Sequence, residues 1–334
     1  MTEEMKTFIL ETNSSCNLDC DYCYADKEEE ELELETIDDF IHEYKGMGLD
    51  RVELLWLGGE SLLRDIEFYE KAFNKLNNSD LNVESRVQTN ATLINEEWAR
   101  IFDGYDLDPG VSLDGPSYIH DKNRKYKNGE GSFDTVIEKI KYLRERGIEP
   151  GGISVVTKDS VGNEEEIYEF FKELNMNPSF NVVETDVRDK QLTQNEYFSF
   201  FKKMYDVWSN DENRNIQITP LKEIAKSFFG SKLRLCDFSD CSDNCISITD
   251  GGSSYLCAKF NRMEDFKLGN IKEGIQSLYD KKSKLIDTRD DIDPKFLGCH
   301  YMNLMVNGDI NDPAYLDAKK ELFNYIHSDL EERL

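Results

Sequence analysis

The sequence predicts an α/β fold in which about six strand–helix units form a parallel sheet that curls into a partial barrel, followed by a second domain. Three observations support this fold class. The chain has 334 residues, of which 39% are hydrophobic and 32% charged, so it can bury a sizeable core. Short apolar runs alternate with amphipathic stretches. Successive runs are separated by the length of one helix, which implies right-handed crossovers between parallel strands.

Six apolar segments are predicted to be strands. They lie at about residues 6–12, 51–57, 82–88, 108–113, 152–157 and 178–184. Because ligands bind at the carboxyl ends of parallel strands, functional side chains are expected just after these segments.

The helices between the strands are predicted to begin at short polar side chains that can cap the first amides. Thr36 opens TIDDFIHEYKGMG, Asn95 opens NEEWARIF, and Ser132 opens SFDTVIEKIKYLRERG. A further helix is expected at about 162–175. The stretch TQNEYFSFFKKMYDVW predicts a long helix whose aromatic residues pack in the core rather than around a cofactor.

The charge balance excludes a protein that grips phosphate backbones through its general surface, so no nucleic-acid partner is expected. Sixty-eight acidic residues stand against forty basic ones, a net charge of −28. A basic peptide or a small molecule is compatible with the negative potential of such a surface. A surface that is acidic only because it is well solvated explains the acidic excess equally well. The N-terminus has no signal-peptide pattern and no long apolar run occurs, so a cytoplasmic protein without membrane contact is expected.

Eight cysteines in a cytoplasmic chain indicate metal ligation or redox chemistry rather than a disulfide scaffold. Cys16, Cys20 and Cys23 form C-x3-C-x2-C directly after the first predicted strand. A structural zinc site usually needs four ligands, whereas three thiolates on a cubane iron–sulfur cluster leave one iron able to bind a small molecule. The competing interpretation is three unrelated loop cysteines.

This first cysteine group resembles the defining motif of the radical S-adenosylmethionine (SAM) superfamily, C-x3-C-x-Φ-C, with Tyr22 at the aromatic position. The resemblance implies a partial (β/α)6 barrel, a 4Fe-4S cluster and bound SAM. WLGGE after the second strand looks like the family's GGE motif, which implies that Gly58, Gly59 and Glu60 contact the amino group of the SAM methionine moiety. Glycines allow close backbone approach and a carboxylate can accept from an ammonium.

Two later segments, VQTNATLI and VSLDGPSYIHDKNR, are similar to those of the radical SAM subfamily that carries C-terminal SPASM domains. This subfamily includes peptide maturases and anaerobic sulfatase-maturating enzymes. The resemblance makes Asn90, Ser112 and Arg124 candidate contacts for the ribose and carboxylate of SAM. A solvated loop position is the alternative for Arg124.

The second cysteine group looks like the start of a SPASM domain or of the shorter twitch domain, whose opening pattern is C-x9-15-G-x4-C. Cys241, Gly252 and Cys257 fit this pattern, and Cys236 occupies an upstream position seen in several members. DGG before SSYLC predicts a hairpin turn in a β-ribbon. Residues 1–225 are therefore expected to form the radical SAM barrel and residues 226–334 the SPASM/twitch-like domain.

Beyond this pattern the chain keeps only one further cysteine. Phe296, Met305 and Asp309 stand at three places where the family has cysteines, and Cys299 stands at the fourth. One auxiliary cluster is therefore expected, on Cys236, Cys241 and Cys257, with a fourth ligand from Cys245, Cys299 or Asp309, or a vacancy for substrate. Thiolate is the preferred ligand of iron–sulfur clusters, and a zinc site on four of the five thiols is the alternative.

By resemblance, the cluster would reduce SAM to a 5′-deoxyadenosyl radical that abstracts hydrogen from the substrate. The favoured substrate is a ribosomal peptide, joined internally by a thioether, ether or carbon–carbon bond. Sulfatase maturases have an Asp where this chain has Ala258, which argues against formylglycine formation. Two further hypotheses are the oxidation of a small-molecule alcohol by a twitch-type dehydrogenase and a metal-bearing binding module without catalysis.

Partners and catalytic groups are less defined. Few residues precede the first strand, so a leader peptide would be bound by a separate protein or, where the leader is basic, by the acidic surface. A flavodoxin or ferredoxin is the expected electron donor. Tyr301 and Asp309 are candidates for acid, base or radical relay, and each could instead have a packing or solvated role.

Overall fold

The computed structural model describes residues 5–25, 27, 29–233, 235–239, 241–242, 245–286 and 292–334. Spatial contacts divide the chain into two compact units. Unit 1 comprises Met1–Ser112, Arg124–Pro150 and Ser242–Leu285, and unit 2 comprises Leu113–Asn123, Gly151–Cys241 and Ile286–Leu334. The division predicted at residue 225 stays a prediction.

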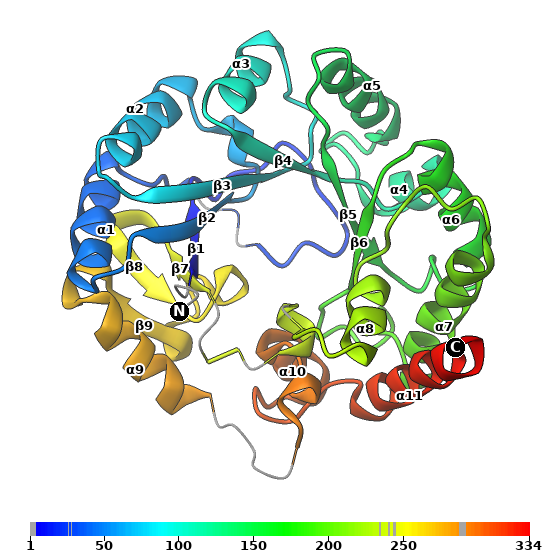
Figure 1. Ribbon diagram of the computed structural model, residues 1–334. Coiled ribbons are helices and arrows are strands. Elements are labelled where there is room, and N and C mark those ends of the chain that lie inside the picture. Colours follow the sequence, from blue (N-terminus) through cyan, green and yellow to red (C-terminus); the bar gives the residue numbers. More distant parts are fainter. Residues whose placement is uncertain are drawn as a thin grey trace. The chain divides into compact units, whose positions relative to one another are not determined.

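Unit 1 is built on a sheet whose first four strands are parallel (Figure 1). These strands are β1 (Lys6–Glu11), β2 (Arg51–Leu57), β3 (Asn82–Thr89) and β4 (Leu107–Ser112). They lie in the order β4-β3-β2-β1, as expected when each crossover returns the chain to the next position. All four coincide with predicted strands to within one residue at each end.

Helices follow each of these strands in the chain. They are α1 (Leu34–Gly46), α2 (Ile66–Asn77), α3 (Glu96–Gly104) and α5 (Phe133–Arg144). Asn95 caps α3 as predicted, because its side chain accepts from the Trp98 N–H. Thr36 does not cap α1, which begins two residues earlier with Glu33 at the cap position. Ser132 is the cap residue of α5, but its hydroxyl donates to the Arg124 carbonyl instead of accepting from the helix.

The second cysteine group contributes an antiparallel ribbon to the same sheet. Strand β7 (Ile246–Ile248) pairs in parallel with β1 and antiparallel with β8 (Ser253–Tyr255), which in turn pairs with β9 (Lys267–Asn270). Helix α9 (Ile275–Leu285) follows β9. The predicted turn at DGG is confirmed, and Gly251 and Gly252 hold positive φ angles there.

Unit 2 contains β5 (Gly151–Val156) and β6 (Pro178–Val182), which pair in parallel within two residues of the predicted segments. Its helices are α4 (Ser117–Asn123), α6 (Glu164–Glu173), α7 (Gln194–Asn210), α8 (Leu221–Phe228), α10 (His300–Asn307) and α11 (Leu316–Arg333). Thr193 and Glu196 form a capping box at the start of α7. Five of the six aromatic residues of α7 are buried in the core and Phe198 is half-buried, which confirms the packing interpretation.

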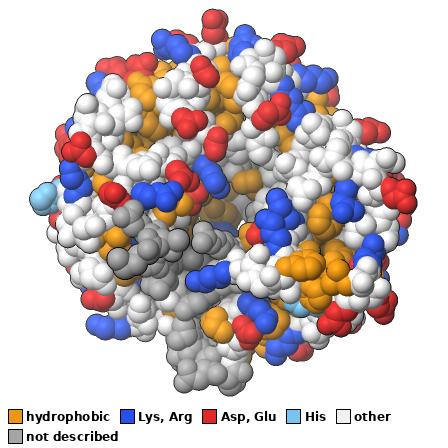
Figure 2. Space-filling model, in the orientation of Figure 1, with side chains coloured by type: hydrophobic (Ala, Val, Ile, Leu, Met, Phe, Trp, Pro, Cys, Tyr) orange, Lys and Arg blue, Asp and Glu red, His pale blue; other side chains and the backbone are white. Residues whose placement is uncertain are grey.

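No helix of the described residues is long and apolar enough to cross a membrane. Figure 2 shows acidic and basic side chains interspersed over the described part of one face, so the acidic excess is not gathered into a single patch there.

Candidate functional site

The first cysteine loop follows β1 and is fixed to the carboxyl end of β2 by backbone hydrogen bonds. The Thr12 N–H donates to the Leu57 carbonyl at 2.8 Å. Further on, the Gly59 N–H donates to Asn13 O at 3.0 Å, and the Glu60 N–H donates to Ser15 O at 2.8 Å. The loop that carries the thiols is therefore attached to the GGE segment along its whole approach to Cys16.

The two glycines of this segment are required by that attachment. A Cβ on Gly58 would lie 2.2 Å from Asn13 O, and one on Gly59 would lie 2.4 Å from both Ser14 O and Ser15 O. Any larger residue would push the loop away, because the atoms in conflict belong to the backbone. The two glycines predict a close approach to a ligand, whereas in the structure they make a close approach between two segments of the chain. A contact of these glycines with SAM stays a prediction.

Glu60 is fully buried and its carboxylate ties the end of β2 to the end of β3. It accepts from the Thr89 hydroxyl at 2.6 Å, from the Asn90 N–H at 2.6 Å and from the Leu62 N–H at 3.0 Å. Burial raises the pKa of Glu60, and these hydrogen bonds and the charge of Arg124 act in the opposite direction. A carboxylate has about four lone-pair sites, so one more donor can still be accepted.

Asn90 connects the end of β3 to the cysteine loop. Its Nδ2 donates to the Asn17 Oδ1 at 2.9 Å and lies 3.9 Å from the Cys16 sulfur. Its Oδ1 accepts from both the N–H and the hydroxyl of Thr92. The predicted SAM contact is thus a nearly buried amide that lies beside the first thiol.

The three thiols of the first group range from buried to exposed. Cys16 is buried, Cys20 is half-buried and Cys23 is exposed. The Leu18 N–H lies 3.5 Å from the Cys16 sulfur. Burial raises the pKa of the Cys16 thiol, while the Leu18 N–H lowers it. Hydrogen-bond donors placed at the sulfur stabilise a thiolate, and they change the reduction potential of a cluster that the thiolate holds.

Arg124 and Tyr22 lie together beside the loop. The guanidinium carbon of Arg124 is 5.4 Å from the centre of the Tyr22 ring, a cation–π distance. Arg124 is buried rather than in a solvated loop. Ser112, at the end of β4, is also buried, and its hydroxyl accepts from the Gln88 amide at 3.0 Å. Unit 1 thus holds every predicted SAM contact.

This chemistry fits an iron–sulfur cluster and SAM. The loop offers three thiols with donors aimed at the most buried one, and the surrounding groups are polar but enclosed. The Oδ1 atom of Asn13 is buried and accepts no hydrogen bond from the described residues, while its Nδ2 donates to Glu60 O. A buried acceptor of this kind has room for a donor from a ligand.

The second cysteine group is divided between the two units. Cys236, Cys241 and Cys299 belong to unit 2, and Cys245 and Cys257 to unit 1. The predicted ligand set draws on both units, and it stays a prediction. No three His, Cys, Asp or Glu side chains of the described residues are close enough to hold a single metal ion.

Within unit 2, Asp237 links two of these cysteine segments. Its Oδ1 accepts from the Cys299 N–H at 3.2 Å and from the Lys319 ammonium at 2.6 Å. Tyr301 is buried on α10, and Asp309 is exposed after that helix. The Asp309 carboxylate accepts from the Asn311 N–H at 2.9 Å. The roles predicted for Tyr301 and Asp309 stay predictions.

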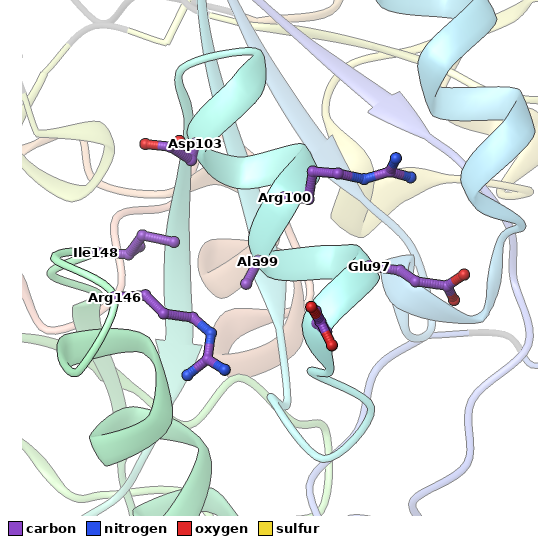
Figure 3. A pocket seen from close by; sticks show the side chains of 7 residues that line it. Glu97, Ala99, Arg100, Asp103, Arg146 and Ile148 are labelled. Atoms are coloured by element: carbon purple, nitrogen blue, oxygen red, sulfur yellow. The ribbon is translucent and has the colours of Figure 1, made fainter.

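A surface hollow of about 630 Å³ lies elsewhere in unit 1 (Figure 3). It is lined by α3 and by the segment after α5, with Arg100 and Arg146 among several acidic side chains. None of its lining residues is a predicted site residue or a cysteine. The thiols and the polar strand ends, not this hollow, therefore define the candidate site.

The family description that matches the chain is "Radical SAM superfamily", over residues 10–174. This stretch runs from β1 past the cysteine loop, the GGE segment and Arg124. The chain belongs to the radical SAM superfamily. It is a radical SAM enzyme, and its cofactors are the 4Fe-4S cluster and the SAM of that superfamily.

Relatives extend the likeness over almost the whole chain. A cysteine-type anaerobic sulfatase-maturating enzyme of Clostridium novyi is 28% identical over 330 residues, 92% of this chain and 88% of the relative. The solved structure of anSMEcpe with bound AdoMet has a TM-score of 0.86 at 22% identity, with 98% of each chain covered. Streptococcus suis SuiB bound to the precursor peptide SuiA has a TM-score of 0.67 at 17% identity, covering 94% of this chain and 76% of SuiB.

These likenesses confirm the predicted fold class, a radical SAM partial barrel with a C-terminal SPASM-like region. Sequence reasoning about this radical SAM enzyme missed Asn13, Asn17 and Thr89, although all three contact predicted site residues. Their signal is positional, because each is a polar residue at or just after the carboxyl end of a strand.

Proposed function

We propose that this radical SAM enzyme oxidises a side chain of a peptide substrate and links it to a second side chain through a thioether, ether or carbon–carbon bond. The observation that carries the proposal is the loop of Cys16, Cys20 and Cys23, attached to the ends of parallel strands in a chain of this superfamily. The peptide class is supported by two similar structures, of which one was solved with the Kp18Cys peptide and the other with SuiA.

When bound, the reduced cluster and SAM supply a carbon-centred radical that removes one hydrogen atom from the substrate. The chain's own residues hold and shield this chemistry. Cys16, Cys20 and Cys23 would bind the cluster and leave one iron for SAM. The buried groups around Glu60 and Asn90 would orient SAM and exclude water.

A cross-link removes two hydrogens from the peptide in total. For a thioether, one C–H and one S–H bond break and one C–S bond forms. One hydrogen atom leaves with the deoxyadenosyl group, and the other leaves as a proton and an electron. We assign the electron to a cluster on the second cysteine group, from which a flavodoxin or ferredoxin could remove it.

Formylglycine formation is the second candidate, because a cysteine-type sulfatase-maturating relative aligns over 92% of this chain. Ala258 argues against it. This residue is buried beside Cys257 in the chain and has no carboxylate with which to take a proton. Another carboxylate would have to act as the base.

The test is anaerobic reconstitution followed by reaction with SAM, a chemical reductant and two synthetic peptides. One is the Kp18Cys peptide, and the other copies whichever short Cys- or Lys-rich reading frame sequencing finds next to the gene. A cross-linked product loses two hydrogens, keeps its sulfur and resists fragmentation between the linked residues. Formylglycine loses the sulfur and reacts with a hydrazide.

The Cys16→Ala variant supplies the control, because it should form neither product nor 5′-deoxyadenosine. Release of 5′-deoxyadenosine with a small alcohol but with neither peptide would favour the dehydrogenase. Zinc-loaded, colourless protein that does not cleave SAM would leave only the binding module.

A further inference from the structure

Helix α9 carries a lysine on its buried face. The buried residues Ile275, Leu278, Tyr279 and Lys282 recur with the spacing of one helix face. Lys282 has no exposed surface at all. Lysine is almost never fully buried without a partner for its charge, so this position needs an explanation.

The partners of Lys282 are neutral. Its Nζ donates to the Cys245 carbonyl at 2.6 Å and to the Leu256 carbonyl at 3.2 Å. An ammonium has three N–H donors, and these carbonyls use two. Among the described carboxylates, none forms a salt bridge with Lys282, so within that part of the chain the charge is solvated but not neutralised.

The other fully buried lysine of the described chain shows the usual solution. Lys319 also has no exposed surface, and its Nζ lies 2.6 Å from the Asp237 carboxylate. A buried cation beside a carboxylate recovers much of the free energy lost with water, whereas two carbonyl dipoles recover less. Lys282 is therefore suited to an anion that the polypeptide itself does not supply.

The ribbon brings the chain segments of two cysteines to this ammonium. The antiparallel pairing of β7 and β8 ends with Ser247 opposite Tyr255, and Cys245 and Cys257 each lie two residues beyond that last pair. The Lys282 Nζ donates to Cys245 O and to the carbonyl of Leu256, the residue before Cys257, so the two segments converge on it.

We propose that Cys245 is a ligand of the auxiliary cluster together with Cys257, and that Lys282 is the buried counter-charge of that cluster. The proposal rests on the proposed function and concerns the two thiols of the second group that unit 1 carries. A cluster on four thiolates carries net negative charge, and a fixed cation near it makes reduction easier. Lys282 thus acts as a positioning residue that also favours electron uptake at the second site.

The test compares Lys282→Gln with wild type in the iron-loaded full chain. Glutamine keeps N–H donors for the two carbonyls but removes the charge. We expect the second cluster to release iron to a chelator about tenfold faster, in line with other partners of metal ligands. We also expect its midpoint potential to become more negative, while that of the first cluster and SAM cleavage stay unchanged.

Lys281→Gln is the matched control. Lys281 is the neighbouring residue, its ammonium is partly exposed, and it pairs with Glu273 at 2.7 Å. This variant should release iron at the wild-type rate. If Lys282→Gln also releases iron at the wild-type rate and keeps the wild-type midpoint potential, Lys282 only donates hydrogen bonds to the two carbonyls, and its role as the counter-charge of the cluster is disproved.

Cys245→Ser tests the ligand separately. We expect the second cluster's iron to be lost or to give a changed electron paramagnetic resonance signal, while the first cluster still cleaves SAM. A wild-type signal in Cys245→Ser would remove Cys245 from the ligand set. Failure of SAM cleavage in wild type would instead contradict the proposed function, so the two failures can be distinguished.

Discussion

The two cysteine regions of unit 1 are held in place by opposite kinds of charge. The first loop is fixed by hydrogen bonds that converge on the carboxylate of Glu60. The second, the ribbon that carries Cys245 and Cys257, is fixed by strand pairing and by the ammonium of Lys282. A negative group thus supports the first thiols and a positive group the second.

This difference has a direct consequence for clusters at the two places. A buried carboxylate near Cys16 disfavours additional negative charge, in keeping with the raised pKa of that thiol, for which burial is the main cause and Glu60 a lesser one. The buried ammonium of Lys282 favours additional negative charge in the second region. We therefore expect the first cluster to have the lower reduction potential, as an electron donor needs, and a cluster of the kind we propose at the second place to accept electrons more readily.

The largest effects should come from removing one ligand in each region. Cys16→Ala should abolish 5′-deoxyadenosine formation but keep the iron of the second site. Cys257→Ala should lose the iron of the second site but still form 5′-deoxyadenosine. Each variant should lose about four iron atoms, the content of one cubane. Iron analysis and chromatography of the nucleoside products check both. Loss of all iron in either variant would contradict the independence of the two regions.

The next largest effect concerns Arg262, which connects the two regions. Its guanidinium lies 2.6 Å from Glu11 at the end of β1, 2.9 Å from Glu30 and 3.4 Å from Asp250 in the ribbon turn. Arg262→Met leaves the buried Glu11 without a cation and should lower the free energy of unfolding by about 3–5 kcal/mol. Denaturant titration of the variant and of Arg333→Met, which breaks an exposed pair, measures the difference.

The Arg262→Met defect should depend on pH. Burial already raises the pKa of Glu11, and Arg262 opposes that effect. Without Arg262 the pKa of Glu11 rises further, so at acidic pH the carboxyl is neutral and the loss of unfolding free energy in Arg262→Met is small. This loss grows as pH rises through the raised pKa of Glu11. A defect of equal size at acidic and neutral pH would show that lost packing, not charge, is the cause.

The third effect tests how closely the first loop is packed. In Gly59→Ala the new Cβ meets two backbone oxygens at 2.4 Å, so the loop must move and stability should fall by about 3 kcal/mol. Gly104→Ala is the control, because its Cβ meets nothing within 4 Å. Thermal unfolding and first-cluster iron content should both drop only in Gly59→Ala. Unchanged iron content in that variant would show that the loop can adapt.

The sequence predicted what depends on local pattern. The six strands, the cap at Asn95 and the turn at Gly251 follow from periodicity and from the needs of a few backbone positions. The cysteine spacing likewise identified the radical SAM superfamily. These features require no knowledge of which distant residues come together.

The sequence could not predict what depends on packing between distant segments. Gly59 is needed because Ser14 and Ser15, more than forty residues earlier, lie against it. Lys282 stands in an apolar stripe that is typical of an ordinary helix face, and its charge gains meaning only beside the Cys245 carbonyl. Both contacts are made by backbone oxygens, which leave no trace in residue identity.

The smallest effect compares one hydroxyl in each region. Thr89 donates to the Glu60 carboxylate at 2.6 Å, whereas Thr249 donates to the Ser253 carbonyl at 3.4 Å. Thr89→Val should cost about 2 kcal/mol because it removes a bond to a buried charge, and Thr249→Val should cost about 0.5 kcal/mol. Denaturant titration at several pH values checks both variants.

Only part of the Thr89→Val loss should depend on the ionisation of Glu60, because the Thr89 hydroxyl also accepts from the Ala91 N–H at 2.9 Å and that bond is lost at every pH. The Thr89 hydroxyl lowers the pKa of Glu60 against the dominant effect of burial, so it stabilises the charged form. This part of the loss is therefore present above the raised pKa of Glu60 and disappears as pH falls through it, whereas the Thr249→Val loss is the same at every pH. A Thr89→Val loss that does not change between acidic and neutral pH would mean that Glu60 is already protonated near neutral pH, and the charge contrast between the two cysteine regions would then rest on Lys282 alone.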